Sequence, residues 1–280
     1  MEAHAASRRE SGEYTRVEYV AHQRNLILTM LFRALEATGS GHEAQARARL
    51  QEAADLDHAE AQLTIAERAE SAGDLAEAAR WYGRCVALSH ARVALGEDKY
   101  AIAWRRLGVV RLQDGLVESA ADAFYEGARA RDADAQYNLG RLHHWRQLTA
   151  VRPRLSDNGS VEAKAQGEPG TEPEVWREAS IYWYQLAADQ GLAVAQYHLA
   201  SALLASRRPA DRAAACGHFL AAAKSGDADS MWELHEMMRV GRGCEVNHDD
   251  ANRWLAAAAE LGQPEALRKM ELRNLRNPRD

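Results

Sequence analysis

A two-part internal repeat constrains the fold of this 280-residue chain more than any other feature. The first part places alanine ahead of a large apolar residue and a small one, as in Ala61…Ile65-Ala66, Ala103…Leu107-Gly108, Ala135…Leu139-Gly140, Ala195…Leu199-Ala200 and, more weakly, Ser230…Leu234-His235. The second part is a pair with at least one aromatic residue, usually followed by alanine, as in Trp81-Tyr82, Phe124-Tyr125, Trp183-Tyr184, His218-Phe219 and Trp254-Leu255. The two parts recur together and in order, which indicates a repeat architecture.

Each copy of the repeat predicts a helical hairpin. Small residues in its first helix, helix A, would let its second helix, helix B, approach closely, and the aromatic residue would fill the space between neighbouring hairpins. Gly191, Gly226 and Gly262 close the later copies, where glycine supplies a left-handed C-cap without a Cβ clash. One hairpin cannot bury both of its faces, so we predict an all-α, right-handed α-solenoid of about five to six helix–turn–helix repeats.

The last copy of the repeat resembles the Sel1 consensus. From Gly241 to Gly262 it runs GRGCEVNHDDANRWLAAAAELG, with the Gly-x-Gly turn, Asp, Ala-x-x-Trp and closing Gly of that family. Residues 133–140 (ADAQYNLG) and 193–200 (AVAQYHLA) are similar to the start of the same repeat, whereas earlier copies are closer in spacing to tetratricopeptide (TPR) repeats. The resemblance covers residues 59–262 and implies that the protein acts as a scaffold or adaptor that holds partner proteins together. Some secreted Sel1-like proteins carry regular disulfides and have been linked to β-lactamase activity or penicillin binding.

The repeats divide the chain into five segments. We expect a flexible N-terminus at 1–13, TPR-like repeats at 14–145, a flexible insertion at 146–173, Sel1-like repeats at 174–262, and a capping helix and tail at 263–280. The TPR-like segment would begin with helices at 14–37 and 42–56, and Pro264 suits the first turn of the cap. The insertion, rich in proline, glycine and polar residues, is either a tolerated loop or a segment that orders on a partner.

Composition and charge exclude several classes of function. The formal net charge of −6 argues against broad nucleic-acid binding, which needs a basic face. No run of residues approaches the 18 apolar positions of a membrane span, and residues 1–16 lack the apolar core of a secretory signal. We therefore expect a cytoplasmic protein, and its abundance of alanine and arginine indicates a bacterial, GC-rich genome.

Neither the cysteines nor the histidines form a pattern typical of a metal site. Cys85, Cys216 and Cys244 are odd in number and lack a CxxC motif, so we expect reduced thiols, no disulfide framework and no zinc. His143 and His144 are adjacent, and neighbours on a helix point in different directions. Since GxSxG, Walker and Rossmann motifs are also missing, we expect no metal, no cofactor and no catalytic residues.

The candidate site is the concave face, which helix A lines in this architecture. Counting from the apolar residue of each first part gives the candidates Arg105, Tyr137, Arg141, His144, Trp145, Tyr197, Trp232, Glu236 and Arg239. Aromatic residues and arginine often dominate interface energetics, although Tyr137, Tyr197 and Trp232 could equally be packing residues. Three arginines would suit an acidic peptide or a C-terminal carboxylate, through bidentate hydrogen bonds.

The leading hypothesis is a protein-interaction scaffold that binds a peptide or partner protein in its concave groove. The first alternative is a Sel1-like hydrolase, which the absence of a nucleophile–base pair and of paired cysteines disfavours. The second is a helical-repeat RNA binder, which the net acidity disfavours.

Overall fold

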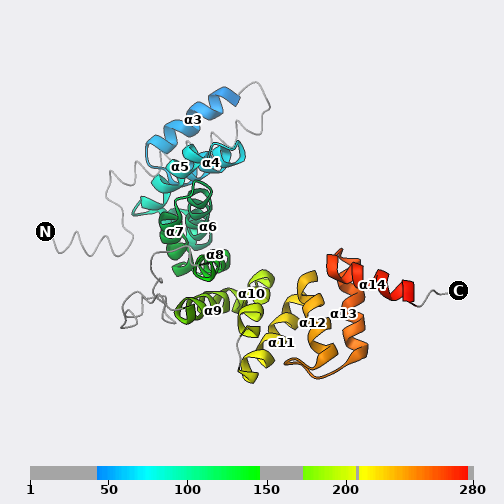
Figure 1. Ribbon diagram of the computed structural model, residues 1–280. Coiled ribbons are helices and arrows are strands. Elements are labelled where there is room, and N and C mark those ends of the chain that lie inside the picture. The colour runs from blue at the N-terminus through cyan, green and yellow to red at the C-terminus, as the bar shows by residue number, and fades with distance from the viewer. Residues whose placement is uncertain (1–42, 146–172, 206–207, 277–280) are drawn as a thin grey trace. The chain divides into compact units, whose positions relative to one another are not determined.

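The computed structural model describes residues 43–145, 173–205 and 208–276, and within these ranges every regular element is a helix (Figure 1). The helices are α3 (Glu43–Asp55), α4 (Ala59–Ser71), α5 (Leu75–Ala87), α6 (Ala91–Gln113), α7 (Val117–Arg129), α8 (Ala133–His144), α9 (Pro173–Asp189), α10 (Ala193–Leu204), α11 (Pro209–Lys224), α12 (Ala228–Val240), α13 (His248–Glu260) and α14 (Pro264–Arg276). The predicted N-terminus at 1–13, the predicted helix at 14–37 and residues 146–172 of the predicted insertion lie outside the described residues.

The chain forms two compact units, unit 1 (Met1–Leu116) and unit 2 (Val117–Asp280). In unit 1, α3 packs on α4, α4 on α5 and α5 on α6, and in unit 2 each helix from α7 to α14 packs on the next. This serial packing confirms the predicted α-solenoid. The expected capping helix is α14, which begins at Pro264 as predicted.

The aromatic residues of helix B form the core, as the repeat predicted. Tyr82, Phe124, Trp183, Tyr184 and Phe219 are all buried. Phe219 of α11, for example, packs in one cluster with Leu234 of α12 and Leu255 of α13, so a single ring joins successive hairpins. Burying a side chain of this size stabilises the fold by about 1.5–3 kcal/mol.

The small residue of helix A permits the close approach of helix B. A Cβ atom on Gly140 in α8 would lie only 2.5 Å from Cδ1 of Tyr184 in α9. The ring of Tyr184 therefore occupies the space that a side chain at position 140 would need. At the ends of the B helices, the predicted left-handed conformation is present at Gly191, Gly226 and Gly262, with φ of 87°, 94° and 83°.

A glutamine near the start of helix A joins it to the preceding helix B. The side-chain amides of Gln62, Gln136 and Gln196 donate to the carbonyl oxygens of Ala54, Ala128 and Ala188, at 2.8, 3.3 and 3.4 Å. Each acceptor lies eight residues before its glutamine, at the end of a helix where backbone carbonyls have no partner within the helix. These bonds repeat at equivalent junctions and satisfy the helix ends locally.

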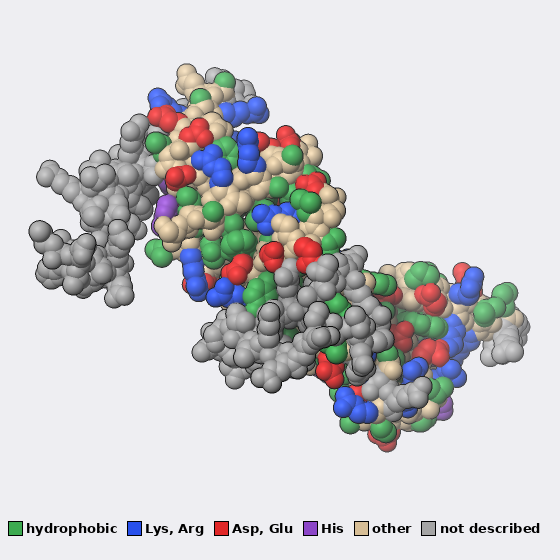
Figure 2. Space-filling model, turned by 60° about the vertical axis from the view of Figure 1, so that its left-hand side comes forward, with side chains coloured by type: hydrophobic (Ala, Val, Ile, Leu, Met, Phe, Trp, Pro, Cys, Tyr) green, Lys and Arg blue, Asp and Glu red, His purple; other side chains and the backbone are tan. Residues whose placement is uncertain are grey.

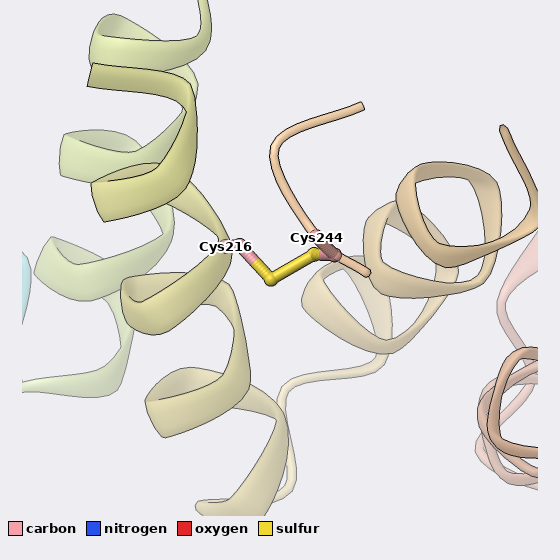
Figure 3. The surroundings of a disulfide bond; sticks show 2 residues. All are labelled: Cys216 and Cys244. Atoms are coloured by element: carbon pink, nitrogen blue, oxygen red, sulfur yellow. A yellow bond between two sulfur atoms is a disulfide. The ribbon is translucent and has the colours of Figure 1, made fainter. Parts of the chain in front are cut away.

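The prediction that all three cysteines are reduced was wrong. Cys216 of α11 and Cys244, in the turn after α12, form a disulfide across a Cα–Cα distance of 5.7 Å (Figure 3). The count and spacing of cysteines carry no information on how hairpins stack, and it is the stacking that brings these two side by side. Cys85 remains a free thiol and is buried against the carbonyl of Ala59, with a sulfur–oxygen distance of 3.4 Å.

We expect Gly140→Ala to destabilise the protein by about 1–3 kcal/mol, because the buried ring of Tyr184 has no room to move away from the new methyl group. Urea denaturation followed by circular dichroism measures this change. Gly217→Ala in α11 is the control, since a Cβ there meets nothing within 4 Å and alanine should stabilise the helix by about 0.5–1 kcal/mol. Equal effects of the two substitutions would contradict the packing described.

Candidate functional site

Helices α8, α9 and α10 of unit 2 bring several rings together in what we call the ring cluster, whose members are Tyr137, His144, Trp145, Tyr184, Tyr197 and His198. Tyr184 stacks on His198 with ring centroids 5.5 Å apart and an interplanar angle of 23°. Tyr137 lies 5.9 Å from Tyr184 and 5.4 Å from His198, between ring centroids. The cluster therefore joins two successive A helices through the aromatic residue of the B helix between them.

The ring cluster has a buried base and an exposed edge. Tyr184 is only 1% exposed, whereas Trp145 is 64% exposed. His144 is also exposed, and its ring lies 5.1 Å from that of Trp145 in an edge-to-face arrangement. Tyr137 and His198 are half-buried between these extremes, so they both pack and contribute surface.

Arg141 supplies a positive charge at this edge. Its guanidinium carbon lies 5.8 Å from the centroid of the Tyr137 ring, and its Nη1 donates to the neutral Asn138 Oδ1 at 3.3 Å. No carboxylate of the described residues pairs with it, in contrast to Arg106, which donates to Glu70 at 2.8 Å. The exposed Arg141 therefore keeps its charge and most of its donors available to a ligand.

Burial determines the charge of two rings in the ring cluster, His198 and Tyr184. Burial lowers the pKa of His198, and electrostatic interactions with His144 and Arg141 add to this effect. Burial likewise raises the pKa of the Tyr184 phenol, whose buried hydroxyl has no hydrogen-bond partner among the residues that the structure describes. At neutral pH these two rings are therefore uncharged, and they lie near the positive charge of Arg141.

A second group of residues lies on α12 and α14, where Glu236 is the shared acceptor. Burial opposes ionisation of Glu236, but hydrogen bonds from Lys269 and Arg239 outweigh it and lower the pKa of the carboxyl group. The Arg239 bond measures 2.8 Å, and Lys269 Nζ also lies 5.1 Å from the ring centroid of Trp232. Arg239 and Glu236 thus satisfy one another, and Lys269 lies beside the half-buried Trp232.

The structure divides the predicted site residues into three places. Tyr137, Arg141, His144, Trp145 and Tyr197 come together at the ring cluster, and Trp232, Glu236 and Arg239 come together on α12. Arg105 is half-buried on α6 and belongs to unit 1.

Sequence reasoning missed three residues of these groups. Tyr184 was assigned to the core alone, although its ring also forms the base of the ring cluster. His198 follows Tyr197 directly, and Lys269 lies on the capping helix. The sequence did contain a signal for His198. It occupies the position in α10 that Asn138 occupies in α8, and Asn138 accepts a hydrogen bond from the candidate residue Arg141.

The adjacent histidines diverge, as expected. His143 is buried, with Nδ1 2.7 Å from the carbonyl oxygen of Leu139, and its ring packs 5.9 Å from that of Trp176. Across the ranges that the structure describes, no three His, Cys, Asp or Glu side chains are grouped to hold a metal ion. In the same ranges, every helix is too short or too polar to cross a bilayer.

Comparisons with known proteins are informative only at the level of structure. No family model matches the sequence, and no curated protein matches it. Among solved structures, a Sel1 repeat protein from Oxalobacter formigenes aligns with a TM-score of 0.53 and 20% identity, over 88% of this chain and 87% of that one. The antigen c5321 of uropathogenic Escherichia coli, which displays an SLR fold, aligns with a TM-score of 0.47 and 21% identity, over 79% of this chain and half of that one.

The lowered pKa of His198 predicts a pH dependence of stability. Because the folded pKa lies below the ordinary 6.5, the unfolded state binds the proton first as the pH falls. The contribution of His198 is therefore present above about pH 6.5 and is lost on acidification below it. We expect the free energy of unfolding to fall less between about pH 7.5 and 5.5 in His198→Gln than in the wild type. Parallel curves from urea denaturation would contradict the environment described for this ring.

Proposed function

Because the chain has the fold of Sel1-repeat proteins, we propose that it is a protein-interaction scaffold rather than an enzyme. Its A helices would bind a peptide or partner protein on their concave face. The resemblance in the repeat sequences and the serial packing of hairpins both support this assignment. In such an array the A helices present one continuous row of side chains.

The exposure of Trp145 carries the proposal. A tryptophan that is 64% exposed leaves a large apolar area in water, and here it stands beside the exposed Arg141 and His144. Trp, Tyr and Arg are the residues that most often dominate binding energy at interfaces. The rings beneath it hold the surface rigid, which lowers the entropic cost of binding.

The chemistry of the ring cluster favours a partner with a carboxylate next to an apolar side chain. Arg141 has no carboxylate partner among the described residues, so an acidic side chain or a chain terminus could take its guanidinium in a bidentate pair. Arg239 is less suitable, because Glu236 already accepts from it. Arg105 stays a candidate for a contact on unit 1.

The Cys216–Cys244 bond removes one sequence argument against a Sel1-like hydrolase, the absence of paired cysteines, but none of the three cysteines is suited to act as its nucleophile. Burial raises the pKa of Cys85 to about 12, so this thiol stays protonated at neutral pH and is a poor nucleophile. Cys216 and Cys244 are oxidised. On the face drawn in Figure 2, basic and acidic side chains of the described residues are interspersed, which does not suit the phosphate backbone of RNA.

The cytoplasmic location stays a prediction from the sequence. The Cys216–Cys244 bond is favoured in an oxidising compartment, whereas the reducing cytoplasm favours the two thiols. Fractionation of cells after blocking thiols with an alkylating reagent distinguishes these locations, since it reports where the protein is and which thiols are free.

We expect Arg141→Glu to weaken partner binding by about tenfold or more, because it replaces the attractive charge by a repulsive one. A photo-activatable phenylalanine analogue in place of Trp145, introduced in cells, first captures and identifies the partner. Binding of that partner to purified wild type and variant is then measured by calorimetry.

Arg253 on α13 provides the matched control. Its side chain is exposed and pairs with Asp250 on the same B helix, so Arg253→Glu should leave the affinity unchanged and an analogue at position 253 should capture little. Equal capture from positions 145 and 253, or equal loss of affinity in the two variants, would overturn the proposed surface. Turnover of a β-lactam or ester by the purified chain would overturn the scaffold assignment itself.

A further inference from the structure

We propose that Cys216 and Cys244 are a reversible redox couple, which controls whether the turn between α12 and α13 is fixed to α11. The turn, which we call the Gly-x-Gly turn, comprises residues 241–247. This inference stands apart from the proposed scaffold function, because it rests on the disulfide and its surroundings alone.

The disulfide joins elements that belong to different hairpins. Cys216 lies on α11, the B helix of one hairpin, and Cys244 lies in the Gly-x-Gly turn of the next hairpin, 28 residues along the chain (Figure 3). The bond therefore crosses the boundary between two repeats. A change in its state alters how one repeat holds its neighbour.

Apart from the disulfide, the Gly-x-Gly turn is held by backbone hydrogen bonds to its own hairpin. The backbone N–H groups of Arg242 and Asn247 donate to the carbonyls of Met237 and Met238 in α12, at 3.0 and 3.1 Å. Toward α11 the contact is close packing. A Cβ on Gly243 would lie 2.3 Å from the carbonyl oxygen of Arg212, and Gly243 has a φ of 83°. The disulfide is thus the strong link in this contact.

The rest of the hairpin has its own anchor. Met231 and Leu234 of α12 are buried with Phe219 of α11 in the core, against which Cys216 and Cys244 pack as partly buried residues. The contact between Phe219 and the two α12 side chains needs no bond between the sulfurs. Opening the disulfide therefore frees the turn while α12 stays docked. The effect is local, as a switch requires, because a low-stability segment can open without global unfolding.

The two bonded cysteines are accessible and the third is not. Cys216 and Cys244 are both partly exposed, whereas Cys85 is 0% exposed. Thiol–disulfide exchange needs a sulfur that an attacking thiolate can reach. A small thiol can therefore act on the Cys216–Cys244 pair and leave Cys85 untouched.

The reaction balances with a low-molecular-weight thiol and its disulfide as the co-reactant. A small thiolate attacks one protein sulfur, the Cys216–Cys244 bond breaks, and a mixed disulfide forms while the other cysteine takes up a proton. A second small thiolate attacks the mixed disulfide, which releases the remaining cysteine and the small disulfide. Two small thiols supply two electrons and two protons, and the reverse sequence closes the bond.

Release of the turn reaches the start of α13. Asn247 caps that helix by accepting from the backbone N–H of Asp250 at 3.0 Å, and His235 Nδ1 lies 2.9 Å from the carbonyl oxygen of Ala251. Because the His235 contact holds the first turn of α13 to α12, the freed segment would run from Arg242 to Asn247. Reduction would loosen one edge of the last hairpins and oxidation would fix it.

Hydrogen exchange of the full chain in glutathione buffers tests this proposal. We expect the amides of Arg242 and Asn247 to exchange about tenfold faster or more in reduced than in oxidised glutathione. The amides of Met231 and Leu234 should keep their protection in both. Alkylation and mass spectrometry should show that Cys216 and Cys244 change state together and reversibly as the glutathione ratio is varied.

Variants separate the couple from other effects of reduction. Cys216→Ser and Cys244→Ser should each exchange rapidly at the turn in both buffers, whereas Cys85→Ala should respond like the wild type. Three results would overturn the proposal: equal exchange at the turn in both buffers, free thiols at both positions under every ratio, or loss of protection throughout α12 on reduction. The last would make the bond a structural support of the whole hairpin.

Discussion

The rest of the structure depends on one contact, which is the close approach of helix B to a small residue on helix A. At Gly140 the distance to the ring of Tyr184 leaves no room for a methyl group. Because that ring fills the space between helices, each hairpin has a defined thickness, and the next hairpin can stack on it in register. The cores around Phe219 and Tyr184 repeat this solution along unit 2.

The same packing builds the candidate binding surface. Tyr184 is a core residue of its hairpin, yet its ring passes beneath α8 and meets both Tyr137 and His198. Core residues and surface residues thus meet in one ring cluster, in which the buried Tyr184 supports the exposed Arg141 and Trp145. Tyr137 is accordingly both a packing residue and a surface residue, and the two readings that its sequence position allowed are not exclusive.

The local pattern of the chain was enough to predict the helices, the buried aromatic residues and the left-handed glycines, because each depends on residues within one hairpin. It was not enough to predict contacts between hairpins. The pairing of Lys269 with Glu236, the stacking of His198 on Tyr184 and the Cys216–Cys244 bond all join different helices across the stack. Their geometry follows from the rotation between hairpins, which no periodicity within a single repeat encodes.

The glutamine bridges have a consequence for how such a chain can change. Gln62, Gln136 and Gln196 each close the junction between one helix and the next by a bond to a carbonyl eight residues earlier. Each of these three junctions therefore has a side-chain bond to the backbone that is formed within one short stretch of the chain. A whole hairpin can be duplicated or deleted together with its junction, so the array can lengthen or shorten by recombination while the helix-end carbonyl at the junction keeps its glutamine donor.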